Sequence, residues 1–238
     1  MFPYDDALAA AVKTAPTSIA DVLTTMQAID TLCVPGDGLK WFNWLYLQVT
    51  KAVENRVATG GFIDQAWLTE LDVQFATLFF NALSASLTGA VCPGCWGAVF
   101  AVRNKTDIAR IQFALAGMNA HINHDLPFAI DGTCQSTGTV PQHGSAQYND
   151  YTGLNAPMDA LIDMAKQTLN VRLLGDPLPA LCQLEDTIAA WNLATARENA
   201  WNTSESLWQD SPALRAAHMG IIDGLTTVIS KVLLVAVP

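Results

Sequence analysis

Two histidines and an aspartate fall within five residues of one predicted helix, and they are the residues of this sequence best suited to chemistry. Asp125 lies four residues after His121, and His124 lies three after it, so the three side chains share one helix face. Imidazole titrates near neutral pH, and a carboxylate beside it can orient the ring or stabilise its protonated form. We therefore predict that His124 is the primary acid or base, with His121 as its partner. The orienting carboxylate is Asp125 or Asp72, because a half-buried carboxylate such as Asp72 needs a partner and the two histidines are natural ones.

The residues around this cluster predict a polar site at a helix end. Gly117 lies one turn before His121 and has no side chain, which leaves room for a ligand or for the close approach of a backbone. Pro127 lacks an N–H donor and disfavours helical geometry at the residue before it, so the helix is expected to end or kink there. Asn119 and Asn123 add a polar pair at a spacing of four.

Three interpretations of the cluster stay open. In the first, it performs metal-free general acid-base catalysis. In the second, the same His and Asp side chains bind a zinc or iron ion, with Asp72, a carboxylate within an apolar helix pattern, as a further ligand. In the third, it is a buried polar network that only fixes helix ends. No second HxxxH or HxxE element is present. We therefore prefer the interpretation without a cofactor, and a bound zinc or iron ion is the alternative.

Helices must position this cluster, because apolar residues recur at spacings of three and four along most of the chain and no strand pattern is evident. A polar loop over 131–149 is long enough to be a lid or a binding segment. The expected fold is an all-α, single-domain irregular multi-helix bundle over 1–238, with a long polar loop after the helix that carries His121 and with 1–16 as a candidate flexible segment. The predicted helices cover 18–29, 39–57, 64–87, a short stretch after Cys95, 107–124, 154–174, 178–208 and 213–235.

The composition limits the partners. Of the 238 residues, 51% are hydrophobic and only 14% are charged, which indicates an apolar pocket or a subunit interface such as that of a homodimer. A net charge of −10 without a basic run argues against nucleic acid and anionic membranes as partners. Asp223 and Lys231 interrupt the apolar C-terminal stretch, so we predict a buried core helix there and no membrane span.

The five cysteines are odd in number and irregular in spacing, which is typical of reduced thiols in a soluble cytoplasmic protein, and the N-terminus shows no secretory signal. Cys92 and Cys95 form a CxxC pair. The sequence around them lacks the strand-turn-helix pattern of a redox motif, and no second CxxC pair is present to complete a zinc site. A redox or metal role for them is the less favoured interpretation. His143 is expected to be an exposed loop residue and His218 a packing residue.

The stretch 111–127 resembles the hallmark of a widespread family of helical proteins known only as a domain of unknown function. Weaker similarities at 36–38, 42–50 and 71–76 extend the resemblance over nearly the whole chain. It implies the all-helical fold but no activity. It also implies a set of pocket residues, to which the aromatic side chain of Trp44 is added: Asn43, Tyr46, Asp72, Asn119, His121, Asn123, His124, Asp125 and Asn155.

These observations predict a small-molecule enzyme of the cyclase, isomerase or lyase type in specialised metabolism. It would act on a largely apolar substrate through His/Asp acid-base chemistry. Two alternatives remain: a zinc- or iron-dependent hydrolase that uses the same cluster, and a non-catalytic protein that binds an apolar ligand.

Overall fold

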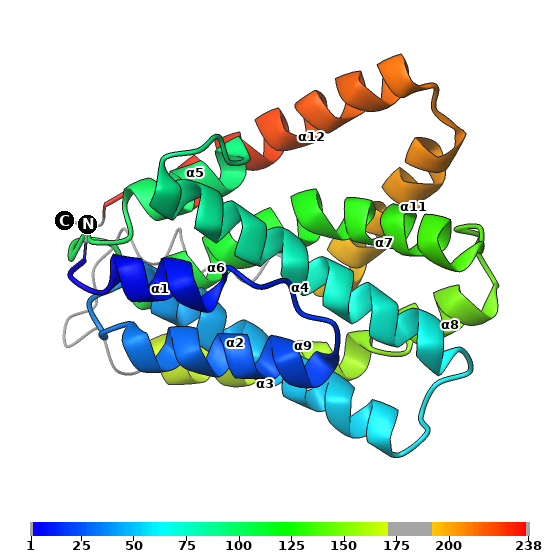
Figure 1. Ribbon diagram of the computed structural model, residues 1–238, viewed down its shortest axis with the longest axis horizontal. Coiled ribbons are helices and arrows are strands. Elements are labelled where there is room, and N and C mark those ends of the chain that lie inside the picture. The colour runs from blue at the N-terminus through cyan, green and yellow to red at the C-terminus, as the bar shows by residue number, and fades with distance from the viewer. Residues whose placement is uncertain (1, 171–191, 237–238) are drawn as a thin grey trace.

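The computed structural model describes residues 2–170 and 192–236, and every regular element in those ranges is a helix (Figure 1). The predicted all-α bundle is thereby confirmed for this part of the chain. The end of the helix predicted over 154–174 and the first part of that predicted over 178–208 lie outside the described residues. The elements are α1 (Asp5–Ala11), α2 (Ile19–Leu32), α3 (Gly38–Ala58), α4 (Gln65–Thr88), α5 (Gly94–Ala101), α6 (Arg110–Ala120), η1 (His121–Asp125), α7 (Leu126–Thr137), α8 (Ala146–Thr152), α9 (Asn155–Asn170), α11 (Leu193–Gln209) and α12 (Pro212–Leu233).

The centre of the fold is one long helical run formed by α6, η1 and α7. The helices α3 and α12 pack against α6, and α4 and α11 pack against α7. All ten residues from Ile111 to Ala120 are buried, polar ones included. A helix that is buried on all sides must satisfy its polar side chains through neighbouring helices, so this run is where the fold brings polar groups together.

Several helices begin where the sequence supplies a capping side chain. Ser18 accepts a hydrogen bond from the backbone N–H of Asp21 at the start of α2, and Asp64 accepts one from Trp67 at the start of α4. The helix predicted over 107–124 was expected to begin with Asp107 as its cap, and this start is wrong. There α6 begins later, at Arg110, and the side chain of Gln112 accepts a hydrogen bond from the preceding backbone instead.

The helix that carries the histidines was expected to end or kink at Pro127, and it does not end there. The chain widens into the π-helical turn η1, in which the N–H of Leu126 bonds to the carbonyl of His121, and it continues directly as α7. Pro127 is the second residue of α7. The wider turn accommodates the proline ring and its missing donor without breaking the helix, and such turns recur at functional sites.

The predicted loop over 131–149 is mostly helical. The polar residues up to Thr137 complete α7, and α8 begins at Ala146, so only 138–145 remain as a connection. The polar side chains here form tertiary contacts: the carboxylate of Asp131 pairs with Arg215, and Ser136 accepts a hydrogen bond from Gln74. Composition alone suggested a loop because these partners are distant in the sequence.

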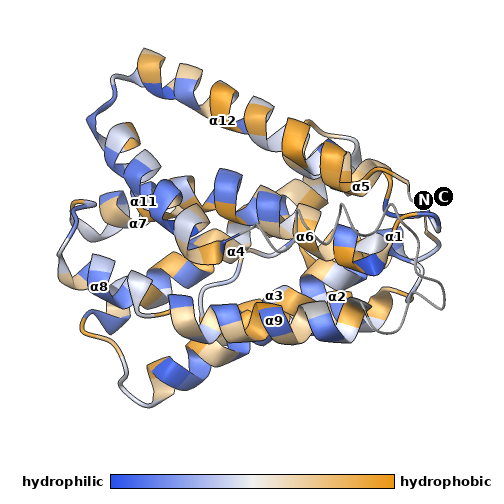
Figure 2. Ribbon diagram, turned by 180° about the vertical axis from the view of Figure 1, so that it is seen from behind, coloured by the Kyte–Doolittle hydropathy of each residue, from blue (hydrophilic) through white to orange (hydrophobic). Residues whose placement is uncertain are grey.

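The prediction of a buried C-terminal helix is wrong. Only Thr226, Ser230 and Leu233 of α12 are buried, while apolar side chains such as Leu225 at 65% and Val232 at 64% stay exposed. Figure 2 shows hydrophobic residues along this helix, whose N-terminal half diverges from the other helices in Figure 1. No helix in the described ranges is long and apolar enough to cross a membrane.

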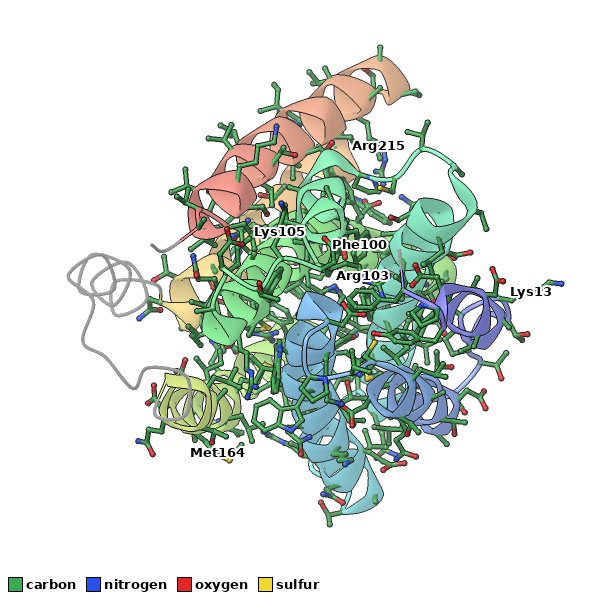
Figure 3. All side chains as sticks on the ribbon, turned by 90° about the vertical axis from the view of Figure 1, so that its left-hand side faces the viewer. Lys13, Phe100, Arg103, Lys105, Met164 and Arg215 are labelled. Carbon is green, nitrogen blue, oxygen red and sulfur yellow. The ribbon has the colours of Figure 1, made fainter. Side chains whose placement is uncertain are left out.

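The first helix is attached to the body of the protein, although its segment 1–16 was a candidate for flexibility. Leu8 is fully buried, and the hydroxyl of Tyr4 donates to Asp37 at 3.0 Å. Asp37 is itself buried, caps α3 and pairs with the guanidinium of Arg103. Figure 3 shows Arg103 among the packed helices, in contrast to the exposed Lys13, which follows α1 and extends outward at the edge of the molecule.

Candidate active site

The carboxylate of Asp125 is buried and is shared by two histidines. Its Oδ2 lies 2.9 Å from His121 Nδ1 and its Oδ1 lies 2.7 Å from His124 Nδ1, while Trp96 Nε1 donates to Oδ2 at 2.9 Å. Burial alone would raise the pKa of Asp125, but the hydrogen bonds from the two imidazoles outweigh it and hold the pKa below its usual range. An ionised carboxylate only accepts hydrogen bonds, so both Nδ1 atoms carry hydrogen and both Nε2 atoms are left for other partners.

The imidazole of His121 is enclosed by aromatic rings. It stacks on Phe75 with 3.5 Å between ring centroids, and Tyr46 meets it edge-on at 4.4 Å. Burial lowers the pKa of His121 more than Asp125 raises it, so the ring is neutral at pH 7. Its Nε2 atom is buried and has no hydrogen-bond partner. His121 therefore presents an oriented, unoccupied basic nitrogen, the state required of a general base.

Two small cavities lie between α3, α4, α9, α11 and the central helix. One, of about 20 Å³, is lined by His121, and the other, of about 30 Å³, is lined by Asp72. Each has room for one or two water molecules. Both cavities share the same five lining residues: Tyr46, Val49, Phe75, Met158 and Arg197.

Three residues that line these cavities have buried polar atoms without hydrogen-bond partners: Tyr46 Oη, Asp72 Oδ2 and His121 Nε2. Such atoms are uncommon in folded proteins because each loses its hydration without compensation. Three of them around neighbouring cavities indicate a place where a ligand or ordered water completes the hydrogen bonding.

Asp72 does not contact the histidines, and the predicted pairing with His121 or His124 is wrong. Asp125, on the same helical run, already forms a hydrogen bond with the Nδ1 atom of each imidazole ring. Asp72 faces the neighbouring cavity instead, where burial and the charge of Glu54 raise its pKa to about 7. At neutral pH it is therefore divided between the acid and the carboxylate, and it could either donate or accept a proton.

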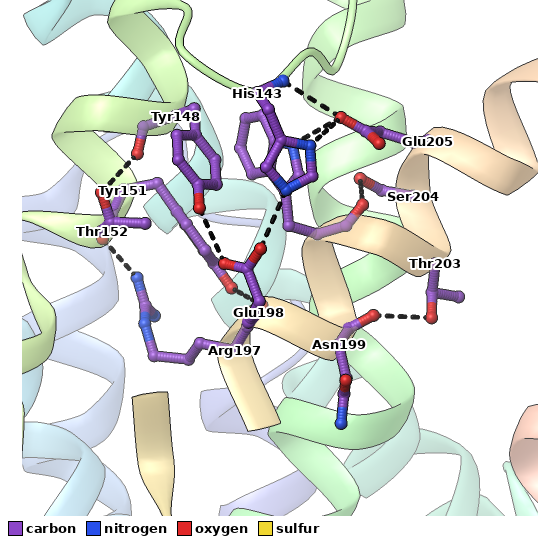
Figure 4. A network of polar contacts seen from close by, with 11 residues as sticks. His143, Tyr148, Tyr151, Thr152, Arg197, Glu198, Asn199, Thr203, Ser204 and Glu205 are labelled. Atoms are coloured by element: carbon purple, nitrogen blue, oxygen red, sulfur yellow. Dashed lines mark hydrogen bonds and ion pairs between the residues drawn. The ribbon is translucent and has the colours of Figure 1, made fainter. Parts of the chain in front are cut away.

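Arg197 adds a buried positive charge to the wall of both cavities and was missed by the sequence analysis. Its Nε donates to Asn155 Oδ1 at 2.7 Å. Its Nη2 donates to the backbone carbonyl of Tyr151 at 2.7 Å (Figure 4). Asn155, predicted as a pocket residue, thus holds a cavity residue in place. The spacing of four from Leu193 and Trp201 put Arg197 on the buried face of its helix, which was the available signal.

A surface groove of about 410 Å³ adjoins the inner cavities between α3 and α9. Val49 and Met158 line the groove and both cavities, and Val53 and Leu154 line the groove and the cavity at Asp72. These four apolar side chains therefore separate the groove from the interior. Met158 is unbranched and adopts many conformations, so its side chain is the easiest of the four to displace.

Several predicted pocket residues hold helices together. Asn43 donates to a backbone carbonyl of α2 at 2.9 Å. Asn119 donates to α12 at 3.0 and 2.9 Å and accepts a hydrogen bond from Asn123 at 2.9 Å. Trp44 packs against the core and is not among the residues lining the cavities described above. Of the predicted pocket residues, Tyr46, Asp72 and His121 line these cavities.

The remaining two histidines lie outside this region. His143 lies between Glu198 and Glu205, at 2.8 and 2.7 Å, and so ties the 138–145 connection to α11 (Figure 4). Its side chain is 42% exposed, as expected for a loop histidine. His218 lies 2.6 Å from a carboxylate oxygen of Asp210, and its side chain is 38% exposed.

Gly117 leaves room for a neighbouring aromatic ring and not for a ligand. A Cβ atom at this position would lie 2.4 Å from the ring of Phe42. The absence of a side chain at Gly117 therefore permits the close packing of α3 against α6 just before η1.

The four residues predicted as metal ligands, His121, His124, Asp125 and Asp72, do not form a metal-like cluster in the described ranges. The group with suitable spacing there consists of Cys95, His124 and Asp223, whose ligand atoms all lie within 4.8 Å of one another. From the sequence, Asp223 was expected only to interrupt an apolar helix.

The two cysteines of the CxxC pair are free thiols. Burial raises the pKa of Cys92 and, more strongly, that of Cys95, and nearby carboxylates add to the effect on Cys95. A redox pair needs a thiolate at neutral pH, so this environment opposes the redox role.

Comparison with known protein families identifies one match. Residues 19–236 match DUF5995, a family of unknown function. Comparisons with curated proteins and with solved structures gave no match. The resemblance inferred from the stretch 111–127 to a family of unknown function is thus confirmed.

Proposed function

Since the chain belongs to the DUF5995 family, whose function is unknown, we propose that it is an acid-base enzyme with His121 Nε2 as its general base. Its substrate is a small, largely apolar molecule that reaches the inner cavities from the groove between α3 and α9. The observation that carries this proposal is the oriented imidazole itself: Nδ1 is fixed by a buried carboxylate, and Nε2 is buried without a partner on a residue that lines a cavity.

The residues around the cavities support a proton transfer within one molecule. His121 Nε2 takes a proton from carbon or oxygen, and Asp125 stabilises the imidazolium that forms. Tyr46 stays protonated because burial raises its pKa well above 10, so its hydroxyl can donate to an oxygen that gains negative charge. Asp72 can return a proton, and the charge of Arg197 stabilises an anion. This set fits an isomerisation, a cyclisation or an elimination.

The shape of the site limits the substrate. The inner cavities accept only water-sized groups, so the substrate needs displacement of the apolar wall that includes Met158. The walls are largely aliphatic and aromatic, with four polar side chains, as is usual for a site that binds an apolar molecule and orients one functional group. We therefore expect the reacting group to be a carbonyl or a hydroxyl on a hydrocarbon skeleton.

The proposal can be tested without knowing the natural substrate. The purified protein is incubated in deuterium oxide with a panel of apolar ketones, 1,3-diketones and enones, and NMR follows the exchange of hydrogen for deuterium at the activated carbons. We expect catalysed exchange for some members of the panel and at least a 100-fold loss in His121→Gln, because general bases contribute about 10²–10⁴ to the rate. The exposed His143→Gln variant is the matched control and should retain the exchange rate.

Two results would count against an enzyme. Exchange that is equal in His121→Gln and the wild type would remove His121 from the chemistry. Ligand binding without exchange, retained in His121→Phe, would instead indicate the non-catalytic apolar-ligand-binding protein. Tyr46→Phe gives a second reading if His121→Gln does not fold, because it removes only the proposed donor and should lower the rate while circular dichroism remains unchanged.

A further inference from the structure

A second group of side chains lies on the other side of Asp125, away from the proposed base. Cys95 at the start of α5, His124 in η1 and Asp223 in α12 come from three elements far apart in the sequence. Their sulfur, ring-nitrogen and carboxylate atoms lie within 4.8 Å of one another, and His124 Nε2 is 4.0 Å from Asp223 Oδ1. We propose that these three residues bind a zinc ion through Cys95 Sγ, His124 Nε2 and a carboxylate oxygen of Asp223.

The spacing suits zinc. With bonds of about 2.0 Å to nitrogen and oxygen and about 2.3 Å to sulfur, a tetrahedral ion places its ligand atoms roughly 3.3–3.6 Å apart. The three ligand atoms lie up to 4.8 Å apart, which exceeds the tetrahedral separations by little more than about 1 Å. Rotations of the side chains can close this difference without moving the helices. Sulfur, imidazole and carboxylate together form a donor set that zinc accepts.

The surrounding residues orient the proposed ligands. His124 Nδ1 lies 2.7 Å from Asp125 Oδ1, which directs the lone pair of Nε2 away from Asp125 and forms the carboxylate-histidine pair common behind bound metals. The oxygens of Asp223 accept hydrogen bonds from the backbone N–H groups of Gly94 and Cys95 at 2.9 and 3.0 Å. Two of the three ligands are therefore held by further hydrogen bonds before any metal binds.

Charge and access also favour a cation. Within the described residues, the ion pairs of Asp223 involve His124 alone, and Asp125 contributes a second negative charge nearby. The side chain of Asp223 is 31% exposed and that of His124 is 11% exposed, so an ion can enter from solvent and a water molecule can take the fourth position. A bound zinc ion would join α5, η1 and α12, and would add a further link between the largely exposed C-terminal helix and the core.

The test uses the full chain, purified in reducing buffer, stripped with a chelator, reloaded with zinc chloride and freed of excess metal. Elemental analysis should give about one zinc per chain, and zinc should raise the melting temperature. Loading with cobalt(II) should give a thiolate-to-cobalt absorption band. Cys95→Ser should abolish that band, and Asp223→Asn should weaken zinc binding at least tenfold. Cys134→Ser, a buried cysteine outside the site, is the matched control and should retain both signals.

Specific outcomes overturn the proposal. The first is a zinc content of less than about half an equivalent per chain in the wild type. The second is an absorption band of cobalt-loaded Cys95→Ser that equals the band of cobalt-loaded Cys134→Ser. If Cys95→Ser fails to fold by circular dichroism, Asp223→Asn decides, and unchanged zinc affinity in that variant refutes the site. These readouts do not depend on His121 or on deuterium exchange, so this proposal can fail while the proposed enzymatic function stands, and the reverse.

Discussion

Removal of the carboxylate of Asp125 should destabilise the protein strongly, because three buried donors depend on it. Trp96 Nε1 and the Nδ1 atoms of His121 and His124 all point at this group. Each donor left without a partner costs about 1–3 kcal/mol, and removal of one partner from a buried charged network costs about 3–5 kcal/mol. We expect Asp125→Ala to lower the free energy of unfolding by about 3–5 kcal/mol.

A comparison with Asp125→Asn separates hydrogen bonding from volume. The amide oxygen can replace Oδ2 and accept from Trp96 and His121. The amide nitrogen then faces His124 Nδ1, which can accept a hydrogen bond if the proton of that ring moves to Nε2. The loss in Asp125→Asn should therefore be roughly half that in Asp125→Ala. Trp96→Phe removes one donor and one bond, and should cost about 1–2 kcal/mol.

Urea unfolding followed by circular dichroism at pH 7 measures these differences, with the exposed Asp107→Ala as the control that should change little. The pKa of Asp125 is lowered in the folded state. Its contribution is thus present above the pKa of the unfolded chain, about 3.9, and is lost as the pH falls through the lower folded value. The reasoning is refuted if Asp125→Ala costs less than about 1 kcal/mol, or if Asp125→Asn is as damaging as Asp125→Ala.

Three further predictions concern the neighbouring residues. Gly117→Ala should cost about 1–3 kcal/mol in urea unfolding because its Cβ would overlap the ring of Phe42, whereas Gly97→Ala, with 3.7 Å to its nearest neighbour, should not destabilise the protein; equal effects would contradict the packing argument. The pKa of His121 is lowered in the folded state, so the wild type should lose stability as the pH falls below about 6.5; a loss of the same size in His121→Gln would assign it to other groups. The pKa of Asp72 is raised to about 7, so its contribution to stability falls as the pH rises from the unfolded-state pKa of about 3.9 to about 7; Asp72→Asn should stabilise the protein more at pH 8 than at pH 5, and the reverse order in thermal melts would be inconsistent with its burial.

Local patterns were sufficient for most of the long helices and for one contact of the site. The spacing of His121 and Asp125 predicted a shared face, and the two side chains meet at 2.9 Å. Such contacts depend on the geometry of a single helix, which the sequence encodes directly. Ser18 and Asp64 likewise cap the helices that follow them, because a cap involves only adjacent residues.

Features that depend on distant partners were not predictable in this way. Asp72 was paired with the histidines because a half-buried carboxylate needs a partner. In the structure, the π-helical turn instead places both imidazole rings within hydrogen-bond distance of Asp125. An apolar C-terminal pattern predicted burial, but α12 makes its inner contacts through Thr226 and Ser230, which bond to Asn119. The spacing and composition of apolar residues identify which helix faces are apolar. They do not show which of these faces pack against another helix.

The shared carboxylate explains why two adjacent histidines can serve different purposes. Both rings donate from Nδ1 to Asp125, so both have the same tautomer, and only the surroundings of Nε2 distinguish them. His121 Nε2 is enclosed by aromatic rings and lacks a partner, which suits proton transfer. His124 Nε2 faces Asp223 in the group that includes Cys95, which suits a metal. A zinc ion on His124 would draw electron density from that ring and strengthen its bond to Asp125, which leaves less negative charge to stabilise protonated His121. Zinc loading should therefore lower the pKa of His121 further, which ¹⁵N NMR titration of the ring can detect in the wild type and which should be absent in Asp223→Asn.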